Sequence, residues 1–359
     1  MWAAVEPPVR AEPVTITREP RLVERVVFAG GLPGCGKTML TPIIGSLARV
    51  ELQRFNEPLE HVCGLRLLGA IREDVATMQI RMLTDLDLYK QMMSREVNLR
   101  PTDLTSICRN PGTWRYLQRI VQPGDAAAVA RIQQDHPILH ITMHNALAIS
   151  PPLFAALGEV ARIIEVVRHP LYMLKQWRAY IERYGTDVRE FTLWFDHEGQ
   201  ALPFWARGWE RQYADANPMD RTIYAIDHLL AQGREALAGL PPAQQRHVLT
   251  VPFEPFVLDP QPWLRRMEAL LGTTVTPATR REMKRQRVPR RRIADGIARK
   301  IYKQYGWEPA RRDASERAEL DRRREFAAKE AGSEALAALD RLSAEYETTH
   351  LKDLPAWQP

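Results

Sequence analysis

The chain has 359 residues, of which 45% are hydrophobic and 26% charged, and its formal net charge is +6. These fractions are typical of a soluble globular protein, and the length suffices for one large α/β domain with an appendage or for two ordinary domains. No stretch approaches the roughly 20 apolar residues that cross a bilayer, so we expect no membrane span and a cytoplasmic location. Cys35, Cys63 and Cys108 are irregularly spaced, which argues against a zinc site or a disulfide framework.

The chain begins with a proline-containing leader and then a strand. Residues 1–22 predict an extended leader, because proline lacks a backbone N–H and excludes regular structure. The main domain is expected over 23–310. It starts with VERVVFAG (23–30), whose short β-branched run is typical of a buried strand.

The turn after this strand reads GLPGCGKT (31–38) and satisfies the pattern GxxxxGK[ST]. Between a strand and a helix, such glycines place backbone N–H groups in a concave turn at the positive end of a helix dipole. The pattern predicts a phosphate or sulfate site, and the alternative is a glycine-rich turn without a ligand. The residues expected to form the site are Gly31, Pro33, Gly34, Cys35, Gly36, Lys37 and Thr38.

The middle of the chain predicts a helical insertion followed by a βαβ unit. Residues 64–134 read as mainly helical. PILHITMHN (137–145) and ARIIEVVRHP (161–170) are apolar runs separated by a helix-sized stretch. Strand, helix and strand at this spacing imply a parallel sheet.

Further elements complete the expected architecture. Residues 171–240 read as helical, HVLTVPFE (247–254) as a strand, and PQPWLRRMEALLG (260–272) as a helix that ends at its glycine. A charged helical tail is expected over 311–359. The fold class is α/β: a P-loop NTPase-like, doubly wound parallel sheet with helices on both faces and a helical insertion.

Basic residues are concentrated in RREMKRQRVPRRRIADGIARK (280–300), where ten Lys or Arg stand against Glu282 and Asp295. A local surplus predicts a phosphate, sulfate or polyanion site, whereas diffuse charge would indicate solubility alone. The alternative is a solvated basic helix. We expect no nucleic-acid partner.

The glycine loop does not by itself identify a nucleotide. An ATP or GTP enzyme also needs a carboxylate near Thr38 to hold Mg²⁺. Glu165 lies in the middle of its predicted strand, Asp227 follows a run spaced like a helix, and Glu51 is a further possibility. An ATP-dependent small-molecule kinase with Mg²⁺ therefore stays open.

Five stretches of the chain, in order, resemble the sulfotransferase family, both cytosolic and carbohydrate-directed. PGCGKT (33–38) falls on the family's PKSGTT or PRSGS[ST] loop, and FNEPLEHV (55–62) is similar to YEPLxHV on the strand after the loop helix. ILHITMHNA (138–146) resembles the strand carrying KTHLP, and ARIIEVVRHPLYMLKQW (161–177) resembles KIIYVxRxPxDVxxS. VPFEPFVLDPQPWLRRMEALLG (251–272) matches the YEDL strand and the helix ending in FLG.

The resemblance implies 3′-phosphoadenosine-5′-phosphosulfate as donor, no metal, and a hydroxyl or amine of a small molecule or glycan as acceptor. It implies His144 as the base and Lys37 as the cation at the leaving phosphate, and it places the donor's 3′-phosphate on Arg168. Further donor-site residues would be Gln176, Arg290, Arg291 and Arg292. The acceptor side is expected in 64–134. Weaker substrate-binding candidates are Glu57, His61 and Arg109.

Three positions depart from the family pattern. Gly34 stands where the family has Lys or Arg, Gln176 where it has serine, and Asn145 where it has proline. The loop has its lysine at Lys37 instead, as in a nucleotide kinase. A second alternative is a non-catalytic nucleotide- or polyanion-binding protein that uses the basic cluster; a His144 that points into the core would favour it. His140, on the same predicted strand, is a rival for the role of base.

Overall fold

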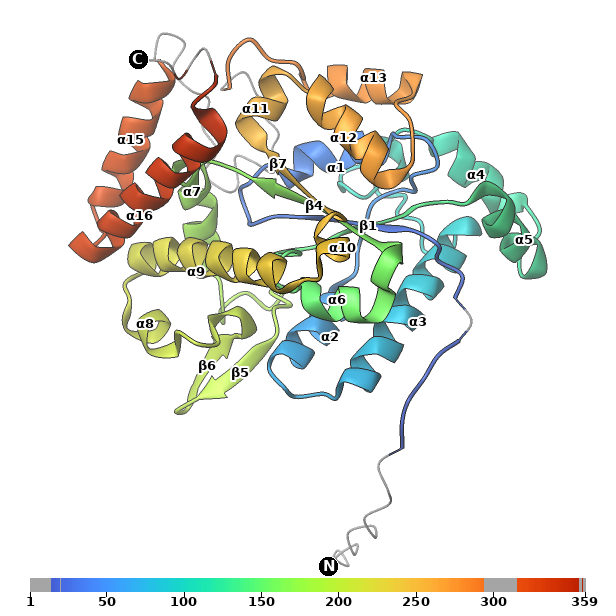
Figure 1. Ribbon diagram of the computed structural model, residues 1–359, viewed down its shortest axis with the longest axis horizontal. Helices are drawn as coiled ribbons and strands as arrows, with labels where there is room; N and C mark the ends of the chain where they lie inside the picture. Colours follow the sequence, from blue (N-terminus) through green and yellow to red (C-terminus); the bar gives the residue numbers. More distant parts are fainter. Residues whose placement is uncertain (1–13, 20, 294–314, 355–356, 358–359) are drawn as a thin grey trace, which may run out of the picture.

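A sheet of five parallel strands, in the order β2-β3-β1-β4-β7, forms the centre of the protein (Figure 1). The computed structural model describes residues 14–19, 21–293, 315–354 and 357. The strands are β1 (Val26–Gly30), β2 (Arg54–Phe55), β3 (Leu139–Thr142), β4 (Ala161–Val167) and β7 (Val248–Pro252). The strand before the glycine loop, β1, therefore lies in the middle, between β3 and β4.

The central strand is apolar on both sides. All five residues of β1 are buried. Val26 and Phe28 pack with one helical layer, and Val27 and Ala29 pack with the other. A parallel strand that is covered on both faces needs apolar side chains at consecutive positions, which explains why this run does not alternate with polar residues.

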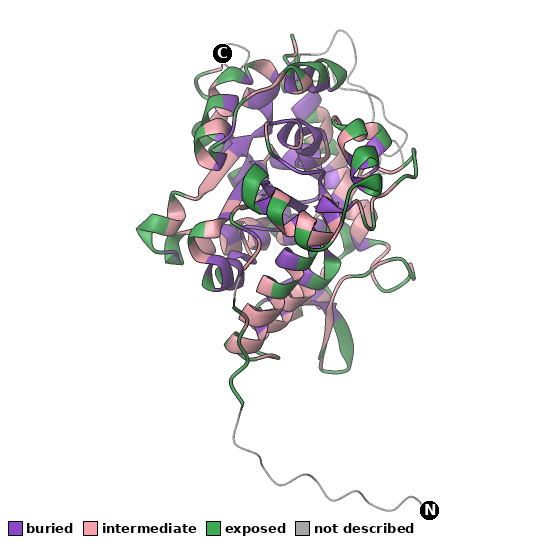
Figure 2. Cartoon of the chain, turned by 90° about the vertical axis from the view of Figure 1, so that its right-hand side faces the viewer, coloured by how far each residue is buried: buried purple, intermediate pink, exposed green. Residues whose placement is uncertain are grey.

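Helices cover both faces of the sheet. The first layer comprises α1 (Lys37–Ile44), α7 (Pro170–Ile181), α9 (Pro218–Gly239), α11 (Phe253–Leu258), α12 (Gln261–Leu271) and α13 (Pro277–Arg285). The second comprises α2 (Glu57–Leu67), α3 (Glu73–Met92), α5 (Ala126–Asp135) and α6 (Ser150–Leu157). Figure 2 shows the buried residues gathered on the sheet and on the inner sides of the helices. The predicted α/β class, a parallel sheet between two helical layers, is confirmed.

The shorter helices are α4 (Thr113–Val121), α8 (Glu210–Asp215) and α10 (Pro242–Gln245). Of these, α8 contributes the buried Tyr213 to the core of the first layer. Among the described residues, no helix combines the length and the apolar character needed to cross a membrane.

Two segments differ from the sequence-based expectation. Within 171–240, β5 (Trp194–His197) and β6 (Gln200–Pro203) form an antiparallel hairpin. Its turn residues, Glu198 and Gly199, both have positive φ, 52° and 82°, as two-residue hairpin turns require. In FNEPLEHV only Phe55 belongs to a strand, because Asn56 caps α2 by accepting the Leu59 N–H at 2.9 Å.

Two C-terminal helices, α15 (Glu316–Ala328) and α16 (Ser333–Tyr346), pack against the first layer at α7 and α9 (Figure 1). Their inner sides are apolar, and Leu320, Leu339 and Leu342 are each at most 3% exposed. The C-terminal helices thus share the hydrophobic core of the first layer.

Glu51, a candidate Mg²⁺ ligand in the sequence, is held by α4. Its carboxylate is 1% exposed and accepts hydrogen bonds from Arg119 at 2.7 and 3.0 Å and from the Tyr116 hydroxyl at 2.8 Å. Burial raises the pKa of Glu51, but Arg115 and Arg119 outweigh it and hold the pKa below its usual range. The carboxylate is therefore charged and serves to anchor α4 to the sheet.

Replacing Glu51 by alanine is expected to lower the free energy of unfolding by about 3–5 kcal/mol, because Arg119 would stay buried without its partner. Urea denaturation measures this loss. The matched control is Asp340→Ala, which breaks a surface pair with Arg324 whose two side chains are each 47% exposed. That pair should contribute less than about 1 kcal/mol. Equal losses in the two variants would contradict the assignment.

Candidate functional site

The carboxyl ends of the three central strands meet at one edge of the sheet. β1 runs into the glycine loop, β3 into His144, and β4 into Arg168. In open parallel sheets, ligands bind in the crevice outside the carboxyl ends of the strands, where the connections diverge to opposite sides. The topology alone therefore brings the loop, His144 and Arg168 to one edge.

The glycine loop adopts a conformation that other residues cannot take. Gly31, Gly34 and Gly36 have φ of 134°, 88° and 101°. A Cβ on Gly36 would lie 2.3 Å from the ring of Phe253, and one on Gly31 would lie 2.4 Å from the Val166 carbonyl oxygen. Since Gly36 is the N-cap of α1, the first amides of this helix open onto the concave side of the turn.

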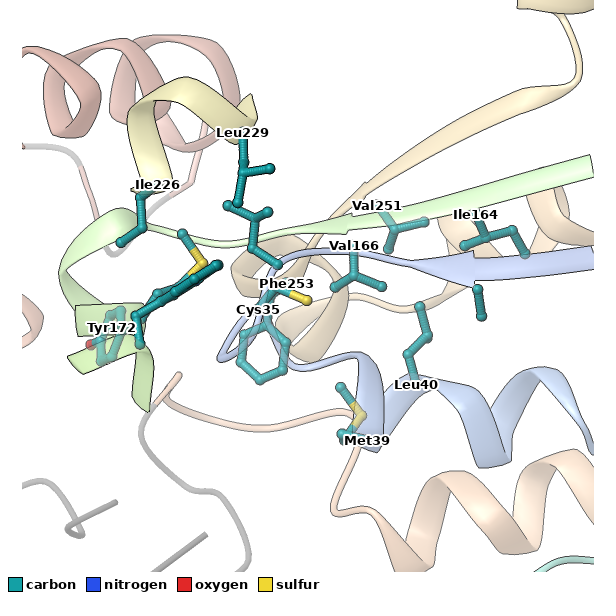
Figure 3. Close-up of a cluster of buried hydrophobic side chains, with 14 of the residues drawn as sticks. Cys35, Met39, Leu40, Ile164, Val166, Tyr172, Ile226, Leu229, Val251 and Phe253 are labelled. Carbon is teal, nitrogen blue, oxygen red and sulfur yellow. The ribbon is translucent and has the colours of Figure 1, made fainter. Parts of the chain in front are cut away.

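Apolar packing supports the loop from the core side. Cys35 is 1% exposed, and Figure 3 shows its side chain together with Val166 and Phe253 in the core of the first layer. Its N–H closes the turn onto the Leu32 carbonyl at 3.1 Å. Burial raises the pKa of the Cys35 thiol to about 11. Cys35 and the buried Pro33 therefore shape the loop rather than offer reactive groups.

Lys37 and Thr38 open the first turn of α1. The Lys37 side chain is 7% exposed, and its Nζ donates to the Gly31 carbonyl oxygen at 2.8 Å. Burial lowers the pKa of Lys37, against the charges of Cys35, Glu60 and Glu165, which raise it. Thr38 is half-buried, and its hydroxyl has no hydrogen-bond partner in the described part of the chain. Both groups can turn to an anion in the loop.

His144, directly beyond β3, is held by Glu60 from α2. The His144 N–H donates to Glu60 Oε1 at 2.6 Å, and its Nδ1 lies 3.4 Å from Oε2. The imidazole is 42% exposed and stacks on the ring of Phe55 at 6.4 Å. With Nδ1 facing the carboxylate, Nε2 points to the other side of the ring, as in histidines that work as a base.

His144 and Lys37, at the same edge of the sheet, stabilise the negative charge of Glu60. Burial raises the pKa of Glu60, but His144 and the nearby Lys37 outweigh it and bring the pKa below its usual range. A carboxylate that stays ionised can orient the imidazole and stabilise its protonated form. The rival histidine, His140, is 0% exposed, and burial lowers its pKa to about 3, so it stays neutral in the core.

Glu60 is not among the site residues that the sequence patterns predict. The weaker candidates from the same segment behave differently: Glu57 is exposed in the first turn of α2, and His61 Nε2 lies 2.6 Å from the Phe191 carbonyl oxygen. Glu60 follows Glu57 by three residues, which is nearly one helical turn. The acid–x–x–acid spacing next to a capping Asn56 is a signal that a helix, rather than a strand, presents a carboxylate there.

Arg168 joins the glycine loop to the end of β4. Its Nη1 donates to the Gly34 carbonyl oxygen at 3.0 Å, and its guanidinium lies 4.3 Å from the ring centre of Phe253 and 4.7 Å from that of Tyr172. Its Nε lies 3.8 Å from the fully buried Glu254 and is buried without a hydrogen-bond partner in the described residues. The buried Nε thus faces Glu254, whereas Nη2 forms no hydrogen bond with the described residues and is the donor left for a ligand on a guanidinium that aromatic rings hold in place.

Two other candidates lie beside Arg168 and the loop. A Cβ on Gly34 would lie 3.4 Å from Gln176 Oε1, so the Gln176 amide reaches the loop. The Arg290 guanidinium lies 5.4 Å from the ring centre of Phe253, which Arg168 also covers, and donates to the Ile293 carbonyl at 2.9 Å. Arg291 and Arg292 are exposed next to it. Residues 294–300 of the basic cluster lie outside the described residues.

Arg109 contacts residues away from the glycine loop. Its Nε donates to the Pro101 carbonyl at 2.5 Å, and its carbonyl accepts a hydrogen bond from Arg285. These contacts connect the loop before α4 to α13, and the structure shows no contact of Arg109 with His144 or the glycine loop among the described residues.

The carboxylates that could hold Mg²⁺ are differently placed. Asp227 lies on α9 and pairs with Arg341 at 2.6 Å, and Glu51 is held by α4. Glu165 lies on β4 opposite Gly30, is 7% exposed, and burial raises its pKa to about 7 against the charge of Lys37. The described residues contain no group of three or more side chains arranged to bind a metal.

No protein-family model and no curated protein matches this chain. Solved structures do. The sulfotransferase domain from the curacin biosynthetic pathway is 12% identical, with 91% of this chain and 99% of that chain covered and a TM-score of 0.45. The sulfotransferase domain of the Synechococcus PCC 7002 olefin synthase is 16% identical, with 92% and 96% covered and a TM-score of 0.40. A sulfotransferase from Mycobacterium avium is 13% identical, with 91% and 77% covered and a TM-score of 0.38. At these identities the likeness concerns the fold alone.

Proposed function

We propose that this protein transfers a sulfuryl group from 3′-phosphoadenosine-5′-phosphosulfate to a hydroxyl or amine of a small molecule or glycan. The observation that carries the proposal is the direct hydrogen bond between Arg168 and the Gly34 carbonyl of the loop. It links an anion cradle to a second cation, as a donor with phosphates at both 5′ and 3′ positions requires. The Glu60–His144 pair, on the other side of β1, supplies the base.

The groups around the crevice fit such a donor. The amides at the start of α1, with Lys37 and Thr38, would hold the 5′-phosphosulfate. Arg168 would hold the 3′-phosphate through Nη2, which forms no hydrogen bond with the described residues, and its guanidinium is positioned by aromatic rings. Gln176 and Arg290, which approach the loop and Phe253, would complete this end of the site.

In this proposal His144 accepts the proton of the acceptor as the new S–O or S–N bond forms. Glu60 stabilises the imidazolium that results, because its carboxylate is ionised and hydrogen-bonded to His144. Lys37 and the loop amides stabilise the charge that develops on the phosphate oxygen when its bond to sulfur breaks. A positioned base of this kind contributes about 10²–10⁴-fold to the rate.

An ATP-dependent kinase is the competing function, and two observations favour it. The sequence keeps the GKT of nucleotide kinases, and Glu165 is a buried carboxylate beside the loop whose Oε2 has no partner in the described residues. Against it, Asp227 and Glu51 are both engaged by arginines. The non-catalytic alternative would gain from a His144 that points into the core, whereas its side chain is 42% exposed.

Donor binding decides between these functions. Adenosine 3′,5′-bisphosphate at 100 times its dissociation constant should stabilise the protein by about 2.7 kcal/mol without any metal, which raises the thermal midpoint. The comparison is a thermal-shift series against ATP with and without Mg²⁺. Stabilisation by ATP with Mg²⁺ alone would overturn the sulfuryl-transfer proposal and favour the kinase.

A further inference from the structure

The C-terminal helix α16 packs against α7 and ends close to Arg168 (Figure 1). Its last residue, Tyr346, is 8% exposed, and its hydroxyl donates to Glu254 Oε2 at 2.6 Å. The next residue, Glu347, places its Oε1 3.2 Å from Nε2 of the fully buried His169. Two consecutive residues near the end of the chain therefore contact two neighbours of Arg168.

Glu254 has different partners on its two carboxylate oxygens. Oε2 accepts the Tyr346 hydroxyl, whereas Oε1 lies 3.4 Å from the His169 backbone nitrogen and 3.8 Å from Arg168 Nε. The side chain is fully buried, and a buried carboxylate is stabilised only by hydrogen bonds and a cation. Among the described residues, Arg168 supplies that cation. The distance of 3.8 Å is longer than a hydrogen bond, so the guanidinium is not locked to the carboxylate.

The Tyr346 hydroxyl occupies the oxygen that Arg168 would need for a two-point ion pair. Arginine and carboxylate pair most strongly through two parallel hydrogen bonds, which use both oxygens. Burial and the charge of Glu254 raise the pKa of Tyr346 well above its usual value, so the hydroxyl stays protonated and donates. With Oε2 occupied, Arg168 directs Nη1 to the Gly34 carbonyl oxygen, and Nη2 is left for a ligand.

We propose that Tyr346 is a positioning residue of the donor site: through Glu254 it holds Arg168 in the orientation that binds the donor's 3′-phosphate. This inference rests on the proposed sulfuryl transfer and extends the donor site to a helix outside the family pattern. The apolar side chains of α15 and α16 already anchor these helices to the first layer. A phenylalanine ring would serve that packing equally well, whereas the hydroxyl serves the carboxylate.

The test is the nucleotide selectivity of Tyr346→Phe, which loses the hydroxyl and keeps the ring. The freed Oε2 can then accept from Arg168 Nη2, so the affinity for adenosine 3′,5′-bisphosphate should fall about three- to tenfold. The affinity for adenosine 5′-monophosphate, which lacks the 3′-phosphate, should stay nearly unchanged. Calorimetric titration of the full chain with both nucleotides measures this selectivity, whereas general loosening of the C-terminal helices would lower both affinities alike.

The matched control is Tyr116→Phe. Tyr116 is also a buried tyrosine whose hydroxyl donates to a buried glutamate, Glu51, at 2.8 Å, but it belongs to α4. This variant should lose stability, as Tyr346→Phe does, and keep the full selectivity. In the Arg168→Ala background, Tyr346→Phe should change the selectivity no further, because the residue through which it acts is absent.

Two results would overturn the positioning role. One is an unchanged selectivity in Tyr346→Phe, including an equal fall in both affinities. The other is the same loss of selectivity in the Arg168→Ala background, which would show that Tyr346 acts by another route. A failure of the proposed function gives a different result: the unsubstituted protein would bind both nucleotides equally well. That result would overturn the sulfuryl-transfer proposal and this inference with it.

Discussion

Replacement of His144 by glutamine is expected to lower kcat by about 10²–10⁴-fold and to leave the affinity for adenosine 3′,5′-bisphosphate unchanged. Glutamine is polar but cannot take up the acceptor's proton. The donor affinity should persist because His144 contacts Glu60 of α2 and the ring of Phe55, and not the glycine loop. Release of the bisphosphate is followed with the best acceptor from a panel of alcohols, phenols, sugars and amines, and calorimetry measures donor affinity.

The chain offers a matched control for His144. His136 also places its Nδ1 beside a glutamate, 2.7 Å from Glu24 Oε2, but it precedes β3 at the opposite edge of the sheet. His136→Gln should therefore leave kcat unchanged. Glu60→Gln should lower kcat by about tenfold, since it removes the negative charge that stabilises the His144 imidazolium, although the amide oxygen can still accept the His144 N–H. An unchanged rate in His144→Gln would mean that another group acts as the base.

Replacement of Arg168 by alanine should weaken binding of adenosine 3′,5′-bisphosphate by about 10–100-fold, the effect of losing hydrogen bonds to a charged group. The affinity for adenosine 5′-monophosphate, which lacks the 3′-phosphate, should fall much less. Calorimetric titration of both nucleotides gives the selectivity directly, and it separates recognition of the 3′-phosphate from general damage to the loop that Arg168 contacts.

The stability of the Arg168 variants needs a separate measurement. Alanine leaves the fully buried Glu254 without the guanidinium at 3.8 Å, so the free protein should unfold at a lower temperature. Arg168→Lys keeps the charge but not the planar stack on Phe253 and Tyr172, and should restore only part of the selectivity. Equal losses for both nucleotides would remove Arg168 from the proposed 3′-phosphate site.

The loop and the strands could be predicted from the sequence because they depend on local chemistry. The three loop glycines with positive φ stand where backbone sterics and Phe253 exclude a side chain. The apolar run of β1, and that of β4 apart from Arg162 and Glu165, indicate strands covered on both faces. The helix that ends at Gly272 was also correctly predicted, since that glycine has the left-handed φ of 60°.

The local sequence does not determine the position of Glu60 or the presence of the β5–β6 hairpin. EPLEHV contains two glutamates and a histidine, and which of them faces His144 depends on the rotation of α2 about its axis. That rotation is set by Leu59 and Cys63, both 0% exposed against the second layer. The hairpin of β5 and β6 was missed because its aromatic residues are equally compatible with a helix.

The sequence by itself determined that a glycine-rich loop, the predicted anion site, lies between a buried strand and a helix, since spacing and residue type decide this within a few positions. The tertiary structure decided which distant groups surround it. Parallel pairing of β1 with β3 and β4 aligns the ends of three strands that are far apart in sequence. Packing of α2 then turns Glu60 to His144, and stacking on Phe253 turns Arg168 to Gly34. These orientations arise from side-chain packing over long sequence separations, which a linear pattern does not contain.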